Sequence, residues 1–121
     1  MKLIKVRPGA LVPVIKDNDN RWTIFAAEQV LIPKMSTAHI PTGIALDLKG
    51  NTGIMLEGGS KLNVRGVFPI DYLFDDENHK ELVIVVANLN NMDVVVTKKL
   101  QIAKFSFVAK KVEEVWEVSS L

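Results

Sequence analysis

Five acidic side chains gather in one short stretch of this chain and form its densest group of chemically active residues. They are Asp71, Asp75, Asp76, Glu77 and Glu81. Carboxylates this close together can hold a hydrated magnesium ion, or one of them can act as a general base. Such a run is more often a solvated loop, so both interpretations stay open.

A second stretch, Gly58-Gly59-Ser60, could bind an anion. Its small residues can present backbone N–H groups to a phosphate. Gly53, Gly58 and Ser60 also have the spacing of a phosphate-binding loop, but glycine at position 59 stands where that loop needs lysine. An ordinary hairpin turn is the alternative, and it is the commoner use of such a sequence.

The other candidates carry little chemistry. His39 and His79 have no second histidine or cysteine at the spacing of metal ligands, so no metal is expected there. The chain has no cysteine, which excludes a disulfide and a thiol nucleophile. Its last residues, Ser119-Ser120-Leu121, fit the loose pattern of chain ends that peptide-binding domains capture, and a frayed terminus fits them too.

Composition limits the class of protein. The 121 residues are 48% hydrophobic and carry a net charge of +1. A chain of this length can bury one core, so we expect a single domain over residues 1–121. The charge balance gives no reason to expect nucleic-acid binding. The longest apolar run, residues 82–87, is far shorter than the roughly 20 residues of a membrane span, and no secretory signal is evident. By elimination we expect a cytoplasmic protein.

The elements that must position these residues follow a β pattern. Apolar residues alternate with others from Ile44 to Leu48, as in a strand with one buried face. Gly50-Asn51 then predicts a hairpin turn into a second strand at residues 53–56. The best helical candidate, Phe25 to Leu31, is short and fits equally well as strand–turn–strand.

The second half of the chain continues the β pattern. Residues 82–87 are apolar at every position, which is typical of a central strand covered on both faces. Asn90-Asn91 is expected to turn that strand into another at residues 93–96. Between Leu100 and Val108 the apolar residues change parity, which predicts a bulge near Lys104 or burial on both faces. Many short strands indicate an all-β sandwich, jelly roll or barrel.

Five stretches, taken in order, resemble the conserved segments of the trimeric dUTPase family. They are Pro41 to Leu46, Gly58 to Leu62, Tyr72 to Leu82, the strand that ends at Asn88, and Leu100 to Val108. The resemblance covers residues 20 to 118. It implies a jelly-roll or distorted β-barrel fold and a homotrimer with sites between subunits, and it implies magnesium as cofactor if the protein is an active enzyme.

The phosphate side of the resembled site differs from the family pattern. In the family, an aspartate helps to hold the magnesium–triphosphate, and Thr23 stands at the matching position here. The family's Arg-Ser-Gly segment grips phosphate, whereas Gly58-Gly59-Ser60 has no arginine. Leu100-Gln101 replaces an Asp-Arg pair. The family's arginine-bearing C-terminal arm is expected to be missing after Leu121.

The uracil hairpin of the resembled site also differs. Tyr72 falls where a glycine lets the base approach the backbone, and Asn78 replaces the tyrosine on which deoxyribose stacks. Asp75 alone matches a catalytic position, that of the carboxylate which activates the attacking water. A general base without charge stabilisation on the phosphates cannot sustain efficient diphosphate hydrolysis.

Three function classes follow from these observations. The leading hypothesis is a non-catalytic protein with a decayed diphosphatase site that binds a protein partner or a nucleotide, as a phage or viral regulator would. The second is a divergent dUTP diphosphatase or related nucleotide pyrophosphatase that uses Asp75. The third is a trimeric structural component of a particle.

Overall fold

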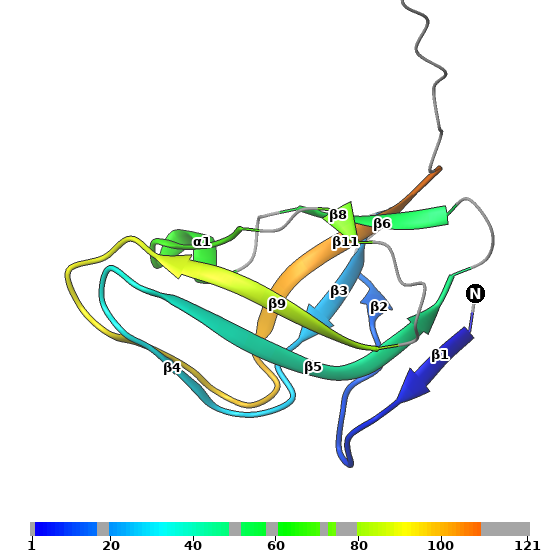
Figure 1. The fold of residues 1–121 in the computed structure, drawn as a ribbon, viewed down its shortest axis with the longest axis horizontal. Helices are drawn as coiled ribbons and strands as arrows, with labels where there is room; N and C mark the ends of the chain where they lie inside the picture. Colours follow the sequence, from blue (N-terminus) through cyan, green and yellow to red (C-terminus); the bar gives the residue numbers. More distant parts are fainter. Residues whose placement is uncertain are drawn as a thin grey trace, which may run out of the picture.

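The computed structural model of the chain describes residues 2–16, 20–48, 52–57, 61–70, 73–74 and 80–109, with the backbone alone at 73–74. Within them the chain is almost entirely β (Figure 1). Its elements are β1 (Lys2–Lys5), β2 (Val14–Ile15), β3 (Trp22–Phe25), β4 (Val30–Ile32), β5 (Thr37–Asp47), β6 (Thr52–Glu57), α1 (Lys61–Val64), β7 (Val67–Pro69), β8 (Leu73–Phe74), β9 (Glu81–Asn88), β10 (Val94–Val96) and β11 (Gln101–Ala109). No helix in these ranges is long and apolar enough to cross a membrane.

The strands form two main sheets. One has the order β1-β5-β9-β7 and the other β2-β3-β11-β6-β8, while β10 and β4 form a two-stranded ribbon. Ile40 and Ile84 of the first sheet join one buried cluster with Ile24, Leu56 and Phe105 of the second. Figure 1 shows β5 and β9 side by side across the molecule, with β3 and β11 behind them. The predicted all-β jelly-roll fold is therefore confirmed.

The hairpin predicted around Gly50-Asn51 is wrong. The strands on either side of this segment, β5 and β6, belong to different sheets. Both edges of β5 already pair with β1 and β9, and both edges of β6 pair with β11 and β8. The chain therefore passes from one sheet to the other here, and residues 49–51 themselves lie outside the described ranges. The predicted alternation in β5 also fails, because Ile44, Ala45 and Leu46 are all buried.

Strand β9 is central, as predicted, but its two faces differ. Leu82, Ile84 and Val86 are buried, whereas the residues between them are only partly covered. The turn at Asn90-Asn91 does lead into a strand, yet β10 pairs with β4 and not with β9. The segment from Phe25 to Leu31 is strand–turn–strand.

The change of parity in β11 has the predicted cause, a bulge. The register with β3 shifts between Gln101 and Ala103, so Ile102 and Ala103 are both fully buried. An extra residue in one strand moves every later side chain to the other face. Phe105 consequently enters the core, where it stacks on Trp22 at 6.4 Å between ring centroids.

A glycine fixes the irregular centre of β5. Gly43 has φ = 72° and lies where the pairing with β9 is interrupted, between Pro41 and Ala45. A Cβ atom at this position would come within 2.6 Å of Ala10 Cβ and 3.2 Å of Ala27 Cβ. Both the backbone angle and the close approach require glycine.

A buried asparagine ties two loops together at the end of β9, the loop after β4 and the loop between β9 and β10. Asn88 Nδ2 donates to the carbonyl oxygens of Ile32 at 3.1 Å and Met92 at 2.9 Å, and its Oδ1 accepts from the Asn90 backbone N–H at 2.9 Å. We call Thr42, Gly43 and Asn88 the backbone framework. The side chains of Thr42 and Asn88 form hydrogen bonds with main-chain carbonyl oxygens, and Gly43 allows a backbone angle that a side chain would disfavour. All three lie in the stretches that resemble the dUTPase family.

Candidate functional site

A row of side chains crosses four strands of the five-stranded sheet, on the side away from the core. The register places Val14 opposite Thr23, Thr23 opposite Lys104, and Lys104 opposite Glu57. Directly opposed residues in antiparallel strands project to the same face. We call Thr23, Lys104 and Glu57, together with Arg21, the cross-strand row.

Thr23 is the most unusual member of the row. Its side chain is 1% exposed, and its Oγ1 has no hydrogen-bond partner among the described residues. An unsatisfied buried hydroxyl costs about 1–3 kcal/mol, so such groups are uncommon in folded proteins. A neutral hydroxyl at this place cannot bind a divalent cation as a carboxylate would.

An ion pair joins Arg21 and Glu57, two members of the row. Arg21 Nη1 lies 2.6 Å from Glu57 Oε2, and both side chains are about one-third exposed (35% and 36%). The Glu57 carboxylate, which could have served as a metal ligand, is therefore paired with the Arg21 guanidinium. Lys104, on the strand between Arg21 and Glu57, is the second basic side chain of the row.

The described residues do not fit a magnesium site. They contain no group of three or more His, Asp or Glu residues placed to hold a metal ion. Thr23 is neutral, and Glu57 is held by Arg21. The described side chains of the row therefore offer no set of ligands for a metal ion. The acidic stretch that could have bound magnesium falls mainly within residues 71–79, outside the described side chains.

A second polar cluster secures the chain where β9 begins. Arg7 contacts both oxygens of Glu81, with Nε to Oε2 at 2.6 Å and Nη2 to Oε1 at 3.0 Å. Gly43 N–H donates to the same Oε2 at 2.8 Å, and Glu28 Oε2 lies 3.2 Å from Arg7 Nη1. The hydrogen bond to Glu81 raises the pKa of the Arg7 guanidinium above its ordinary value. This cluster anchors the N-terminal segment to the start of β9.

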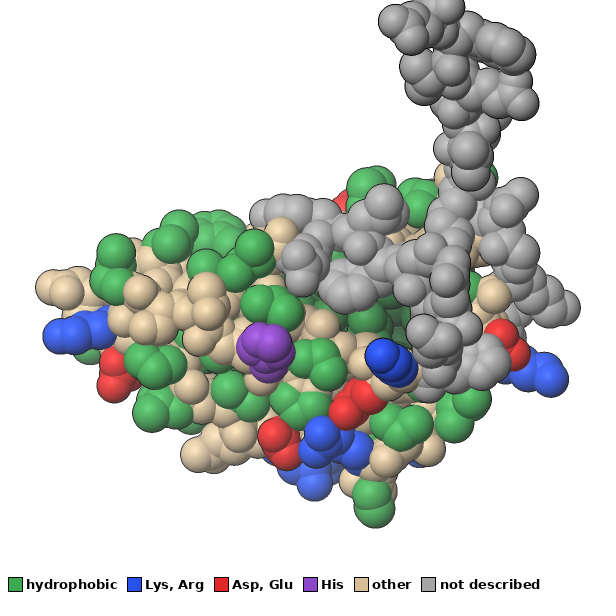
Figure 2. Space-filling view, in the orientation of Figure 1, with side chains coloured by type: hydrophobic (Ala, Val, Ile, Leu, Met, Phe, Trp, Pro, Cys, Tyr) green, Lys and Arg blue, Asp and Glu red, His purple; other side chains and the backbone are tan. Residues whose placement is uncertain are grey.

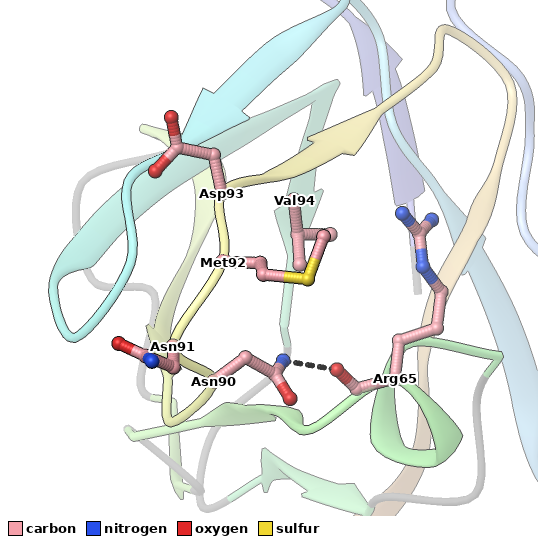
Figure 3. Close-up of a pocket in the computed structure, with 6 residues that line it drawn as sticks. All are labelled: Arg65, Asn90, Asn91, Met92, Asp93 and Val94. Carbon is pink, nitrogen blue, oxygen red and sulfur yellow. Dashed lines mark hydrogen bonds between the residues drawn. The ribbon is translucent and has the colours of Figure 1, made fainter.

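A pocket of about 340 Å³ lies at the other end of β9 (Figure 3). Its lining residues are Arg65, Asn90, Asn91, Met92, Asp93 and Val94. Figure 3 shows the Asn90 amide turned toward the Arg65 carbonyl oxygen, to which it donates. Asp93 Oδ1 accepts from the Lys34 backbone N–H at 2.9 Å. These polar groups hold the turns of the protein, and the pocket carries no chemistry of its own.

Most of the site residues predicted from the sequence lie outside the described part of the chain. These are Gly58, Gly59, Ser60, Tyr72, Asp75 and Asn78, and the chain end at Ser119-Ser120-Leu121 lies outside it as well. Three positions at which the sequence departs from the family pattern are described: Thr23 in β3, Leu100, and Gln101, which lies opposite Phe25.

Sequence reasoning missed Arg21, Glu57 and Lys104 as members of one site. They are separated by 36 or more positions, and only the strand order β3-β11-β6 brings them together. The sequence places only Glu57 next to a stretch that carries the family resemblance, Gly58 to Leu62.

Comparison with known proteins agrees with this architecture. The sequence model of the dUTPase family matches residues 16–121. A deoxyuridine 5'-triphosphate nucleotidohydrolase from Crocosphaera subtropica is 25% identical over 126 residues, which covers 98% of this chain and 89% of the relative.

Solved structures show the same fold at lower identity. A mutant of the dUTPase from phage phi11 of S. aureus, described with a structural Mg(II) ion, superposes with a TM-score of 0.85 at 16% identity, covering 98% of this chain and 96% of that one. A mutant of the dUTPase from phage 80alpha gives 0.87 at 17% identity, covering 99% and 89%. Proteins of this family are typically homotrimers and use Mg²⁺ when active. The match over residues 16–121 and the shared jelly-roll topology place this chain in the dUTPase family.

Proposed function

We propose that this chain is a dUTPase-fold binding protein that does not hydrolyse dUTP. It forms one domain over residues 1–121, assembles as a homotrimer, and binds a nucleotide or a protein partner in the cytoplasm. One observation carries the proposal. Thr23, buried to 1% exposure, puts a neutral hydroxyl where the family resemblance expects the aspartate of the magnesium–triphosphate site.

The missing aspartate at Thr23 is one of several missing groups that would contact the phosphates in the resembled site. Gly58-Gly59-Ser60 has no arginine, and Leu100-Gln101 replaces the family's Asp-Arg pair. Removing one preorganised charge-stabilising group typically slows a reaction by about 10² to 10³-fold, and such losses act in the same direction even where they do not add. A remaining general base at Asp75 cannot compensate, because it contributes about 10² to 10⁴-fold at most.

The basic side chains of the cross-strand row support retained binding of an anion. Arg21 and Lys104 carry the guanidinium and ammonium groups that can donate to a phosphate oxygen without a metal ion. The phage 80alpha dUTPase supports the protein-partner alternative by analogy, since phage dUTPases of that type control the transfer of virulence genes by a G protein-like mechanism. A regulator of phage or viral origin fits this role.

A hydrolysis assay tests the loss of activity. Purified protein with dUTP and magnesium should release no more dUMP than the buffer does, measured by chromatography over hours. The Asp75→Asn variant should behave in the same way. Hydrolysis by the wild type that Asp75→Asn abolishes would reject the proposal.

That outcome would establish the second candidate, an active dUTP diphosphatase. It is favoured by the curated relative, a nucleotidohydrolase whose similarity spans 98% of this chain. In this case Asp75 would serve as the general base and magnesium would be required.

A thermal-shift screen separates the two kinds of partner. A nucleotide at about 100 times its dissociation constant should stabilise the protein by about 2.7 kcal/mol. Arg21→Ala should reduce the shift caused by dUTP, while Lys98→Ala, a matched change at an exposed residue outside the row, should leave it unchanged. No shift with dUTP, dUMP or the four dNTPs would reject nucleotide binding and leave the protein partner.

A further inference from the structure

Three turns meet at one end of the molecule and expose large apolar side chains. They are the turn between β4 and β5, the turn after α1 and the turn between β9 and β10, which lie together at the left of Figure 1. We call their exposed apolar residues the apolar tip: Met35 (69% exposed), Val64 (91%), Leu89 (63%) and Met92 (74%). Figure 2 shows hydrophobic side chains at this end, next to basic and acidic ones.

Hydrogen bonds join the three turns into one surface. The Met35 N–H donates to the Asn90 carbonyl oxygen at 3.2 Å, and the Leu89 N–H donates to the Gly66 carbonyl oxygen at 3.0 Å. Asn90 Nδ2 donates to the Arg65 carbonyl oxygen. Apolar residues that are exposed singly are common, but a connected group of them on a folded protein marks a binding surface.

The fold does not account for the residue types of the apolar tip. Turns favour glycine, asparagine, aspartate and serine, because these residues suit the backbone angles of turns. Met35 instead has φ = 53°, in the left-handed region that L side chains rarely adopt. Each of the four side chains is too exposed to contribute much to the core. Methionine is well suited to a binding surface, since its unbranched thioether adapts to the shape of a partner.

The pocket of about 340 Å³ opens at the apolar tip, and Met92 belongs to both. Figure 3 shows the Met92 side chain pointing across the pocket toward Arg65, with the Asp93 carboxylate turned away from both. Arg65 Nη1 lies 3.4 Å from the Val95 carbonyl oxygen, and in the described part of the chain no carboxylate pairs with this guanidinium. The pocket therefore offers an apolar wall beside an available positive charge.

We propose that the apolar tip binds an acidic segment of a partner protein. A large apolar side chain of the segment fills the pocket beside Met92, and a neighbouring carboxylate of the segment pairs with Arg65. The inference gives the surface and the chemistry for the protein partner proposed above, and in that respect it rests on that proposal. It does not involve the nucleotide site, because the apolar tip and the cross-strand row share no residue.

A peptide fits this surface better than a membrane does. Anionic membranes are bound by clusters of about 4–8 lysine or arginine residues. The apolar tip has Lys34 and Arg65 at its edge, with Asp93 accepting the Lys34 backbone N–H at 2.9 Å. A pocket lined by the amide side chains of Asn90 and Asn91 also offers directional hydrogen bonds, which suit a peptide main chain.

Methyl NMR of protein labelled with ¹³C-methyl methionine tests the proposal. The probe is the synthetic peptide Asp-Glu-Leu-Trp-Asp-Glu, added up to about 1 mM, the range of weak specific binding. The signals of Met35 and Met92 should shift and saturate. The signal of Met55, which is 39% exposed on β6, should stay in place and serves as the internal control. Peptides with serine in place of leucine and tryptophan, or with lysine in place of the acids, should bind at least about tenfold more weakly.

Two variants locate the contact. Arg65→Glu and Met92→Ser should each weaken binding of the acidic peptide by about tenfold or more, because one removes the charge pair and the other the apolar wall. Lys98→Glu makes the same change of charge as Arg65→Glu in the turn before β11, and it should bind as the wild type does. An unchanged Met55 signal shows that each variant is folded.

Four outcomes would overturn the inference. One is the absence of a shift at Met35 and Met92, and another is an equal loss of binding in Lys98→Glu. Co-sedimentation with phosphatidylserine–phosphatidylcholine vesicles, without peptide binding, would identify a membrane as the occupant. Shifts of the same two signals on dilution of the protein alone would identify a second copy of the chain. None of these results would alter the outcome of the dUTP hydrolysis assay, so the two proposals can fail separately.

Discussion

Two buried threonines show how two regions of this protein differ. Thr42 and Thr23 are each 1% exposed, and both lie in strands that resemble the dUTPase family. Thr42 Oγ1 donates to the Leu82 carbonyl oxygen at 2.6 Å, whereas Thr23 Oγ1 has no partner among the described residues. The first belongs to the backbone framework and the second to the cross-strand row.

The difference between the two threonines separates residues that the fold requires from residues that would act on a ligand. Residues of the framework satisfy main-chain groups, which every chain with this topology must satisfy. In the row, Thr23 stands where the family resemblance expects an aspartate, while the strand that carries it is kept. The loss of hydrolysis proposed above would therefore leave the architecture of the family intact.

The largest effect should come from breaking the framework at Gly43. Gly43→Ala combines a positive φ with a Cβ only 2.6 Å from Ala10 Cβ, and it should destabilise the protein by about 3 kcal/mol or more. Gly9→Ala is the matched control, because Gly9 has φ = 76° but its nearest atom, Lys98 Nζ, is 3.5 Å away. It should cost about 1 kcal/mol. Urea unfolding measures both, and equal losses would contradict the steric argument.

Removing the Asn88 side chain should have the next largest effect. Asn88→Ala leaves the carbonyl oxygens of Ile32 and Met92 without their donor and should cost about 2–4 kcal/mol. Asn91→Ala changes an exposed asparagine three residues away and should cost less than about 0.5 kcal/mol. Thermal unfolding of the two variants would disprove the role of Asn88 if their midpoints agreed.

Replacing each threonine by valine sharpens the comparison most directly. Thr42→Val removes a buried hydrogen bond and should cost about 1–2 kcal/mol. Thr23→Val removes a hydroxyl that has no partner, so it should be neutral or stabilise the protein by up to about 1 kcal/mol. The two differences in unfolding free energy should have opposite signs or differ by at least about 1 kcal/mol. A loss at Thr23 equal to that at Thr42 would mean that the hydroxyl is satisfied in solution.

The smallest effect is expected at the Arg21–Glu57 ion pair. Both side chains are about one-third exposed, at 35% and 36%, so their coupling should be about 0.2–1 kcal/mol and should shrink in 1 M salt. A double-mutant cycle with Arg21→Ala and Glu57→Gln isolates this term from the other contacts of Arg21. A coupling above about 2 kcal/mol would show that the row is more deeply buried than its exposure indicates.

Much of the fold could be predicted from the sequence because its signals are local. The parity change between Leu100 and Val108 predicted the bulge that brings Ile102 and Ala103 into the core together. Strand pairing could not be predicted in the same way. Nothing near Gly50-Asn51 indicates that both edges of β5 pair with strands far away in the sequence, so the local residues favour a hairpin that does not form.

The candidate site was less predictable for a related reason. Substitution at Thr23 could be seen from the family resemblance, but its missing hydrogen bond depends on what packs around it. Arg21, Glu57 and Lys104 become one group only through the order of three strands. A site whose residues come from different strands has no fixed spacing in the sequence by which it could be recognised.

The strand order also dictates when this protein can fold during synthesis. β11 lies between β3 and β6 in the five-stranded sheet, although it is the last of the described strands. Similarly, Arg7 near the N-terminus can form its ion pair only after Glu81, 74 residues later, has been synthesised. The five-stranded sheet cannot close while the ribosome still holds the final fifth of the chain, whereas the β1-β5-β9-β7 sheet needs only residues up to Asn88. Contacts this distant in sequence form slowly. Until translation ends, the nascent chain exposes unpaired strand edges and depends on chaperones or on speed to avoid aggregation.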